Sequence, residues 1–226
     1  MAYRLGENLQ REWDADPLAV ELWEALGELE TSPQAGVEKL RNLAERGSPL
    51  AMMHLGDVFV YGRHGLPIEK ETGEYWLTRS AEGGSIEGRF RLANLFVRQK
   101  RGDVALTEWQ TLAAMGYTPA KFYLGYCYYK GHLGLRVDHE KAFELGRRAM
   151  SDGHLHSAHW LASSYQSDGY GVFRKLTGLW IKTKILVPWI WHLQRYPTSD
   201  RLRVPFRMSV MDGRLDDYEE THAIAG

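Results

Sequence analysis

Apolar residues recur every three or four positions along most of the chain, which is the period of an α-helix buried along one face. Between Ala120 and Gly153 the pattern is clearest: Ala120, Leu124 and Tyr128 form a stripe, and two glycines then end the helix. A second apolar stripe begins after Asp138, a residue typical of a helix N-cap, and stops at Gly153. The segment therefore predicts a hairpin of two helices.

The same skeleton recurs before and after this segment. A small residue opens each copy, and the four opening positions are separated by 37, 32 and 37 residues. Self-similarity at this interval is typical of solenoids and other repeat arrays. In the copy with the shorter interval the turn between the helices is short, so its second helix is expected near Asp103 to Ala114. The opening positions are Ala51, Gly88, Ala120 and Ser157.

The best preserved copy reads LGYCYYKGHLG at residues 124–134 and DHEKA at residues 138–142. These motifs resemble the Sel-1-like repeat family, which consists of helix-pair relatives of tetratricopeptide repeats. The resemblance covers residues 48–171, with a half-unit before it at 36–47. Departures are small: Gly88 and Ser157 replace the first alanine of the pattern, and Leu145 replaces its tryptophan.

The resemblance implies an all-α fold, a right-handed α-solenoid of antiparallel helix pairs that forms a tetratricopeptide-like superhelix. It also implies a protein that binds other proteins as a scaffold or adaptor and has no intrinsic catalysis. Four regions are expected. They are an N-terminal capping helix pair (1–48), the repeats (49–171), a basic, Trp-rich capping helix (172–207) and an acidic, flexible tail (208–226).

Within the N-terminal cap we expect helices from Pro17 to Glu30 and from Pro33 to Arg46, preceded by extended chain or a short helical turn. The cap holds ten acids and five bases, which predicts an acidic outer face. A capping unit is required because an end repeat would otherwise expose the apolar face that inner repeats bury.

Composition narrows the class of function. The formal net charge of the 226 residues is −1, which argues against a general nucleic-acid binder. The single cysteine, Cys127, excludes an intrachain disulfide framework and suits a reducing compartment. The first residues contain acids and no apolar run, so no secretory signal is expected. We therefore predict a cytoplasmic protein with a protein partner and no small-molecule substrate.

The residues that repeat in phase, such as Leu55, Trp76, Leu92 and Leu161, are expected to form the core. A partner surface must then use the positions between them on the first helix of each pair, which face the groove in tetratricopeptide-like hairpins. These positions combine aromatic and basic residues, as binding hot spots do. The predicted partner-binding residues are Asp57, Phe90, Asn94, Arg98, Phe122, Tyr126, Tyr129, Lys130, His159, Ser163 and Gln166.

Residues 172–207 contain eight bases and one acid, and their apolar run is too short and too interrupted to span a bilayer. Two interpretations stay open. In the first, a long helix kinked at Pro188 seals the solenoid with Leu179, Ile181, Ile185, Leu186 and Ile190. In the second, the helix docks peripherally at the inner membrane, on anionic lipid or a membrane protein. Its contact residues would be Trp180, Lys182, Lys184, Trp189, Trp191 and Arg195.

Three features that resemble catalytic or metal sites have simpler explanations. His154, His156 and His159 lie close together but without a cysteine, and we interpret them as surface histidines. Cys127 lacks the neighbours of a thiol enzyme and is expected to be packed or at the groove edge. The glycines of the turns lack the strand that precedes a phosphate loop. We therefore predict no enzyme, no cofactor and no metal site.

Overall fold

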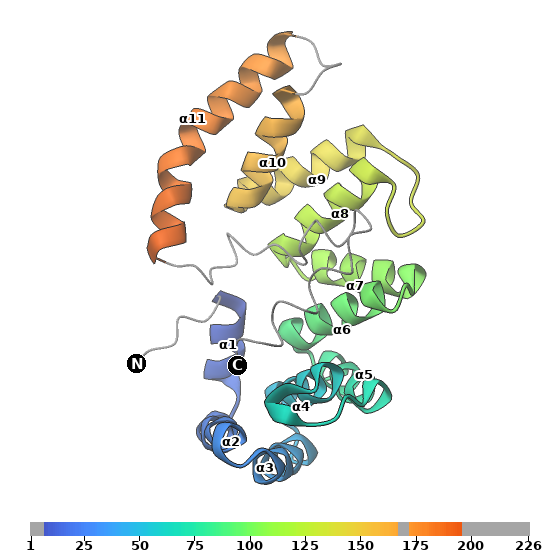
Figure 1. Cartoon of the computed structure of the whole chain (residues 1–226). Helices are drawn as coiled ribbons and strands as arrows, with labels where there is room; N and C mark the ends of the chain where they lie inside the picture. Colours follow the sequence, from blue (N-terminus) through green and yellow to red (C-terminus); the bar gives the residue numbers. More distant parts are fainter. Residues whose placement is uncertain (1–6, 167–171, 196–226) are drawn as a thin grey trace.

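The computed structural model describes residues 7–166 and 172–195 (Figure 1). Within these ranges the regular elements are α-helices and one short 3-10 turn, and no strand occurs. The all-α fold predicted from the sequence is confirmed. The helices are α1 Glu7–Ala15, α2 Ala19–Thr31, α3 Pro33–Glu45, α4 Pro49–Tyr61, α5 Lys70–Glu82, α6 Ile86–Arg98, α7 Gly102–Ala114, α8 Thr118–Lys130, α9 His139–Ser151, α10 Leu155–Gln166 and α11 Val172–Arg195, and the 3-10 turn is Arg63–Gly65.

Successive helices pack in pairs: α2 with α3, α4 with α5, α6 with α7, α8 with α9, and α10 with α11. Each pair also packs against the next, and α4 contacts α6 across one repeat. The pairs stack into a curved array, and α1 and α11 both lie on the inner side of the curve (Figure 1). The architecture is therefore a helical-repeat solenoid.

Helix starts and ends follow the local signals in the sequence. Ser48 caps α4 by accepting a hydrogen bond from the Ala51 backbone N–H at 3.0 Å, and Asp138 caps α9 in the same way from Lys141 at 2.9 Å. Gly62 ends α4 with a φ of 59°, a left-handed conformation that costs glycine little. The predicted helix boundaries in the two best repeats are correct for this reason.

In two of the repeats, glycine at one position allows close approach between the paired helices. A Cβ atom added to Gly56 of α4 would lie 2.5 Å from Cγ of Leu77 on α5. At the equivalent Gly125 of α8, the added atom would lie 3.0 Å from the carbonyl oxygen of Ala142 on α9. Gly125 therefore lies where α9 approaches α8 closely.

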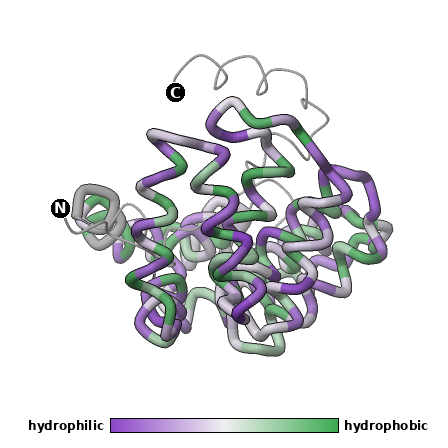
Figure 2. Tube along the Cα trace, turned by 90° about the horizontal axis from the view of Figure 1, so that it is seen from below, coloured by the Kyte–Doolittle hydropathy of each residue, from purple (hydrophilic) through white to green (hydrophobic). Residues whose placement is uncertain are grey.

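The core runs along the solenoid in two clusters of buried residues, one from α2 to α8 and one from α8 to α11. Hydrophobic and hydrophilic residues alternate within the helices (Figure 2), as an amphipathic array requires. Leu55, Leu92 and Leu161, which the repeat phase assigns to the core, are each at most 3% exposed. Tyr128 departs from the expectation: it is half-buried, and Lys141 Nζ lies 4.3 Å from its ring centre.

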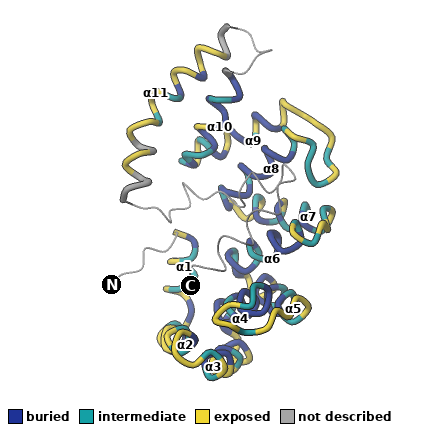
Figure 3. The backbone as a smooth tube through the Cα atoms, in the orientation of Figure 1, coloured by how far each residue is buried: buried dark blue, intermediate teal, exposed yellow. Residues whose placement is uncertain are grey.

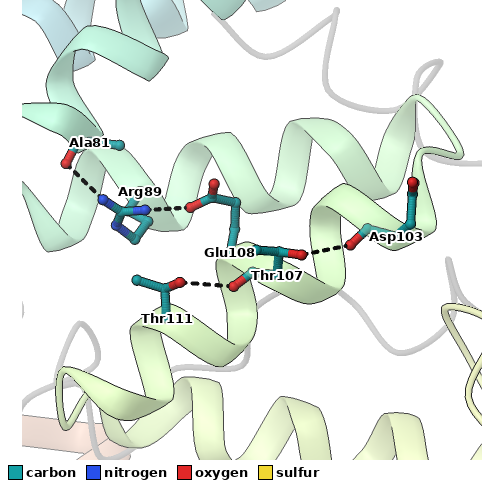
Figure 4. A network of polar contacts seen from close by, with 6 residues as sticks. All are labelled: Ala81, Arg89, Asp103, Thr107, Glu108 and Thr111. Carbon is teal, nitrogen blue, oxygen red and sulfur yellow. Dashed lines mark hydrogen bonds and ion pairs between the residues drawn. The ribbon is translucent and has the colours of Figure 1, made fainter.

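Polar contacts also tie neighbouring pairs together (Figure 4). Arg89 of α6 donates from Nη1 to Glu108 of α7 at 2.6 Å and from Nη2 to the carbonyl oxygen of Ala81 on α5 at 3.0 Å. One guanidinium therefore joins three consecutive helices. Both partners of the ion pair are about four-fifths buried on their side chains, which strengthens the attraction relative to a surface pair.

The N-terminal segment is more ordered than the sequence predicts. Residues 7–15 form the helix α1, which packs against α6 rather than continuing the array. Its Leu9 and Trp13 pack on the core, and the Trp13 ring meets Trp23 of α2 edge-on at 5.9 Å. The following two helices match the predicted capping pair, while the region boundaries proposed from the sequence stay predictions.

The last helix, α11, continues past Pro188 to Arg195 and packs against α10. Of the five residues expected to seal the solenoid, Ile181 is buried and Ile185 is partly buried. Leu179, Leu186 and Ile190 are about half exposed, so the expectation is wrong for them. The reason is helical geometry, because one straight helix can turn only one face toward α10. The acidic tail at 208–226 lies outside the described residues.

Candidate interaction surface

Three of the aromatic residues predicted on the partner surface are buried. Phe90, Phe122 and Tyr126 are 7%, 2% and 5% exposed. Phe90 meets Trp109 of α7 edge-on at 5.6 Å, and Phe122 meets Trp160 of α10 at 6.0 Å. The expectation that these rings are accessible is wrong, because rings on neighbouring helices pack against them.

Tyr129 belongs to the same aromatic cluster but keeps part of its surface. Its ring stacks on His139 of α9 at 4.9 Å and meets Trp160 edge-on at 5.5 Å. Lys130 is exposed, and its Nζ lies 5.9 Å from the Tyr129 ring centre. Of the residues predicted on α8, these two are therefore the accessible ones.

The predicted residues on α10 differ in their exposure. His159 is exposed and Ser163 is half-buried, whereas the side chain of Gln166 lies outside the described residues. His159 lines a shallow groove of about 320 Å³ together with Lys182, Ile185 and Leu186 of α11. This groove is lined mainly by apolar atoms and lies between the last two helices.

A polar cluster occupies the groove positions of α4 and α6. Nη1 of Arg91 donates to Oδ2 of Asp57 at 2.6 Å. The guanidinium carbons of Arg63 and Arg98 lie 5.5 and 5.0 Å from the ring centre of Tyr61. We call these five residues the Tyr61 cluster. Arg63 and Arg98 are exposed, Tyr61 and Arg91 are half-buried, and Asp57 is buried.

Sequence reasoning found only part of this cluster. It selected Asp57 and Arg98 by their phase in the repeat but missed Tyr61, Arg63 and Arg91. Tyr61 lies four residues after Asp57, on the same helical face, so its position carried a usable signal. Arg63 lies in the 3-10 turn after α4, where the repeat phase gives no direction.

The five residues of the cluster include three arginines and one carboxylate. Arginine stays charged in proteins, so the side chains of the cluster themselves have more positive than negative charge at neutral pH. The nearby His54 adds no charge, because burial, and next the charges of Arg91 and Arg63, lower its pKa to about 3. Burial, and next the charge of Asp57, raise the pKa of Tyr61. The phenol is therefore neutral and can donate its hydrogen.

Several buried polar atoms of this region have no hydrogen-bond partner within the described part of the chain. They are Oδ1 of Asp57, Oδ1 of Asn94 and Nε of Arg91. Asp57 and Asn94 are 4% and 9% exposed. Buried polar groups are normally satisfied by protein, water or ligand, and these two acceptors and one donor are covered from solvent.

The helix α1 and the residue Asp16 that follows it anchor the N-terminal ends of α4 and α6, at the opposite ends of these helices from Tyr61 and Arg98. Ser85 Oγ donates to Oε2 of Glu12 at 2.5 Å, and the Glu87 backbone N–H donates to Oε1 at 3.0 Å. Ser48 Oγ donates to Oδ2 of Asp16, also at 2.5 Å. Two carboxylates thus sit at two helix N-termini, where the helix dipole favours negative charge. Burial raises the pKa of Glu12.

The histidine and cysteine features have structural roles. His154 is buried, contrary to the surface position expected for it, and its Nδ1 accepts from the Ser157 backbone N–H at 3.1 Å at the start of α10. Among residues 7–166 and 172–195, no group of three His, Cys, Asp or Glu side chains is placed to hold a metal ion. Cys127 is buried, and burial raises the pKa of its thiol to about 12.

The helix α11 exposes three of the six contact residues expected for its second interpretation, and Lys182 is half-buried. Trp180 and Trp191 are exposed, and Nζ of Lys184 lies 6.0 Å from the Trp180 ring centre. The side chains of Trp189 and Arg195 lie outside the described residues. None of the helices in the described ranges is long and apolar enough to cross a membrane.

Comparison with known families agrees with the repeats seen in the structure. The family model described as Sel1 repeat matches residues 49–85 and 118–154. These two segments are similar to Sel1 repeats. The first consists of α4 and α5, and the second of α8 and α9. Sel1 repeats generally mediate protein–protein interactions and act as non-enzymatic scaffolds.

Solved structures of Sel1-repeat proteins share the fold. A Sel1 repeat protein from Oxalobacter formigenes is 22% identical over 77% of this chain and 75% of that chain, with a TM-score of 0.61. The protective antigen c5321 from uropathogenic Escherichia coli, described as having an SLR fold, is 18% identical, with a TM-score of 0.56. The match covers 81% of this chain but 47% of c5321. At these identities the likeness shows the fold alone.

Proposed function

We propose that this chain is a non-enzymatic scaffold that binds an acidic segment of a partner protein at the Tyr61 cluster. The observation that carries the proposal is the arrangement of Arg63 and Arg98 on the ring of Tyr61, with both guanidinium groups exposed. The one carboxylate in the cluster is buried and already paired with Arg91. We assign the exposed guanidinium of Arg63, with that of Arg98 beside it, as the group that pairs with a carboxylate of the ligand.

The chemistry of the cluster suits a carboxylate-bearing peptide. An arginine guanidinium can bind a carboxylate with two parallel hydrogen bonds, and tyrosine and arginine are the residues most enriched in binding hot spots. The oxygens of Asp57 and Asn94 that lack a partner among the described residues are covered from solvent, so we assign recognition to the exposed guanidinium groups. The cytoplasmic location stays a prediction.

Affinity capture followed by peptide binding tests the proposal. The wild-type chain, an R63E/R98E variant and an R136E/R148E control are used to capture proteins for mass spectrometry. Acidic peptides from the captured proteins are then titrated against each chain. Arg136 and Arg148 are exposed and lie outside the cluster, in the turn before α9 and on α9.

We expect the wild type and the control to bind the same acidic peptides and R63E/R98E to bind them at least about tenfold more weakly, because two charge reversals replace attraction with repulsion. Binding should also weaken as salt is added. Equal binding by R63E/R98E, with an unchanged circular dichroism spectrum, would show that the partner does not use this cluster.

A further inference from the structure

The last helix, α11, carries an apolar face that the solenoid does not use. Seven large apolar side chains on it are between 45% and 73% exposed. Most of the helix is exposed, in contrast to α4, α6 and α8 (Figure 3). The seven residues are Leu176, Leu179, Trp180, Leu186, Val187, Ile190 and Trp191.

These side chains lie on one side of the helix. Successive residues of an α-helix are rotated by about 100°, which places all seven within an arc of about 140°. Gly178, Ile181 and Ile185 lie on the opposite side, where Ile181 and Ile185 join the core beside α10. The helix therefore has two apolar faces. A narrow one packs on the solenoid, and a wider one points away from it.

Lysines border the exposed apolar face on both edges. By the same rotation, Lys184 lies next to Trp180 and Trp191, while Lys175 and Lys182 lie beyond the opposite edge. Nζ of Lys184 is 6.0 Å from the Trp180 ring centre, so this lysine stays close to the apolar face. The sequence of α11 contains no Asp or Glu. An apolar band with one lysine on one edge and two on the other suits a surface that combines an apolar layer with negative charge.

A second copy of the chain fits this face poorly. Two copies of α11 packed through the same face would bring lysine edges together, and the helix has no acid to compensate them. A bilayer with anionic headgroups offers the complementary arrangement: acyl chains for the apolar band and phosphates for the lysines. Tryptophan favours the boundary between these layers because its ring is apolar and its N–H is polar.

We infer that α11 docks the protein on an anionic lipid bilayer, with the helix in the plane of the interface and the Trp180 side turned toward the acyl chains. This inference uses a surface separate from the proposed peptide site, so either can fail without the other.

Flotation of the full chain with liposomes tests the inference. Vesicles of phosphatidylcholine alone are compared with vesicles that also contain phosphatidylglycerol, at low and at high salt. The variants are W180A/W191A and K175Q/K184Q. The matched controls are Y75A/M115A, which removes two exposed apolar side chains elsewhere, and K70Q/R136Q, which removes two exposed charges elsewhere.

We expect the wild type and both controls to float with anionic vesicles at low salt and to stay in the bottom fraction with neutral ones. K175Q/K184Q should lower the partition coefficient about fivefold for each lysine, since each base near an anionic surface contributes that much. W180A/W191A should lower it by about tenfold or more because the largest buried apolar area is lost. If W180A/W191A does not fold, the lysine variant and the salt series still test whether α11 binds the anionic bilayer.

Three results would overturn the inference. The wild type could stay at the bottom of the gradient with anionic vesicles. A dimer could be detected by light scattering without vesicles and be split by W180A/W191A, which would mean that a second copy covers the face. Flotation could require neutralisation of Asp216, Asp217, Glu219 and Glu220, which would mean that the chain's own acidic tail occupies α11.

Discussion

Arg91 lies 2.6 Å from the carboxylate of Asp57, and the two residues belong to the first helices of consecutive repeats. The Asp57 side chain is 6% exposed and that of Arg91 is 26% exposed. This ion pair joins α4 to α6 and neutralises the one acid among the arginines of the Tyr61 cluster. Stability and the proposed binding surface therefore depend on the same pair.

Removing Arg91 should destabilise the fold. In R91A the buried carboxylate of Asp57 loses its partner, and we expect the free energy of unfolding to fall by about 2–3 kcal/mol. Urea denaturation measures the change. R148A is the control, because Arg148 pairs with Glu144 on the surface of α9 and its loss should cost about 0.5 kcal/mol or less. If the two variants are equally stable, the Asp57–Arg91 pair has no special role.

Two glycines in helices should respond to alanine in opposite directions. In G56A the new Cβ would lie 2.5 Å from Leu77 Cγ, and we expect a loss of about 1–3 kcal/mol from overpacking. In G27A, at an exposed position of α2, nothing lies within 4 Å of the new Cβ atom. That change should stabilise by about 0.5–1 kcal/mol through helix propensity. Thermal unfolding of both variants checks the signs, and a stable G56A would contradict the close packing of α4 on α5.

The buried carboxyl of Glu12 should make stability depend on pH. Its pKa in the folded chain is raised above 4.5, mainly by burial. Between 4.5 and the raised value the folded state binds more protons than the unfolded state, so the contribution of Glu12 to stability falls as pH rises. The free energy of unfolding of the wild type minus that of E12Q should therefore be larger near pH 5 than near pH 8.

Urea denaturation of wild type and E12Q at both pH values isolates this effect, because the other titrating groups are shared. A stability difference that stays constant, or that grows in favour of the wild type as pH rises, would mean that Glu12 is not held in a desolvated site beside Ser85.

The thiol of Cys127 should be unreactive in the folded chain. It is buried, and its pKa is raised to about 12, so the reactive thiolate is scarce at pH 8. We expect a disulfide reagent to modify it slowly in buffer and rapidly in urea. A free small thiol in the same buffer is the control for the reagent. Fast modification of the folded protein would place Cys127 at an accessible edge of the groove.

The repeat pattern was sufficient to predict the helices and the residues through which they pack. Leu55 and Leu92 are buried as their phase predicts, and Gly125 lies where α9 approaches α8 most closely. These features follow from local sequence, because the 3.6-residue period fixes which face of a helix is apolar and glycine fixes where chains can turn or touch.

The helix α1 shows where local patterns were insufficient. Its sequence is mostly polar, and its place is set by Glu12 and Asp16, which bond to Ser85 and Ser48 at distant helix starts. No periodicity marks such contacts, since they join residues 73 and 32 positions apart. The same holds for Arg63, which meets Tyr61 only because the turn after α4 folds back.

The sequence by itself determined the class of fold, the helix boundaries of the best repeats and the residues of the core, because each is set by a short-range period. Only the tertiary structure decided which groove positions are accessible. Phe122 and Arg98 occupy groove positions predicted in the same way, yet the Phe122 ring is covered by α10 while Arg98 is exposed beside the ring of Tyr61. The side chains of the next repeat decide between these outcomes, and a helical period contains no information about them.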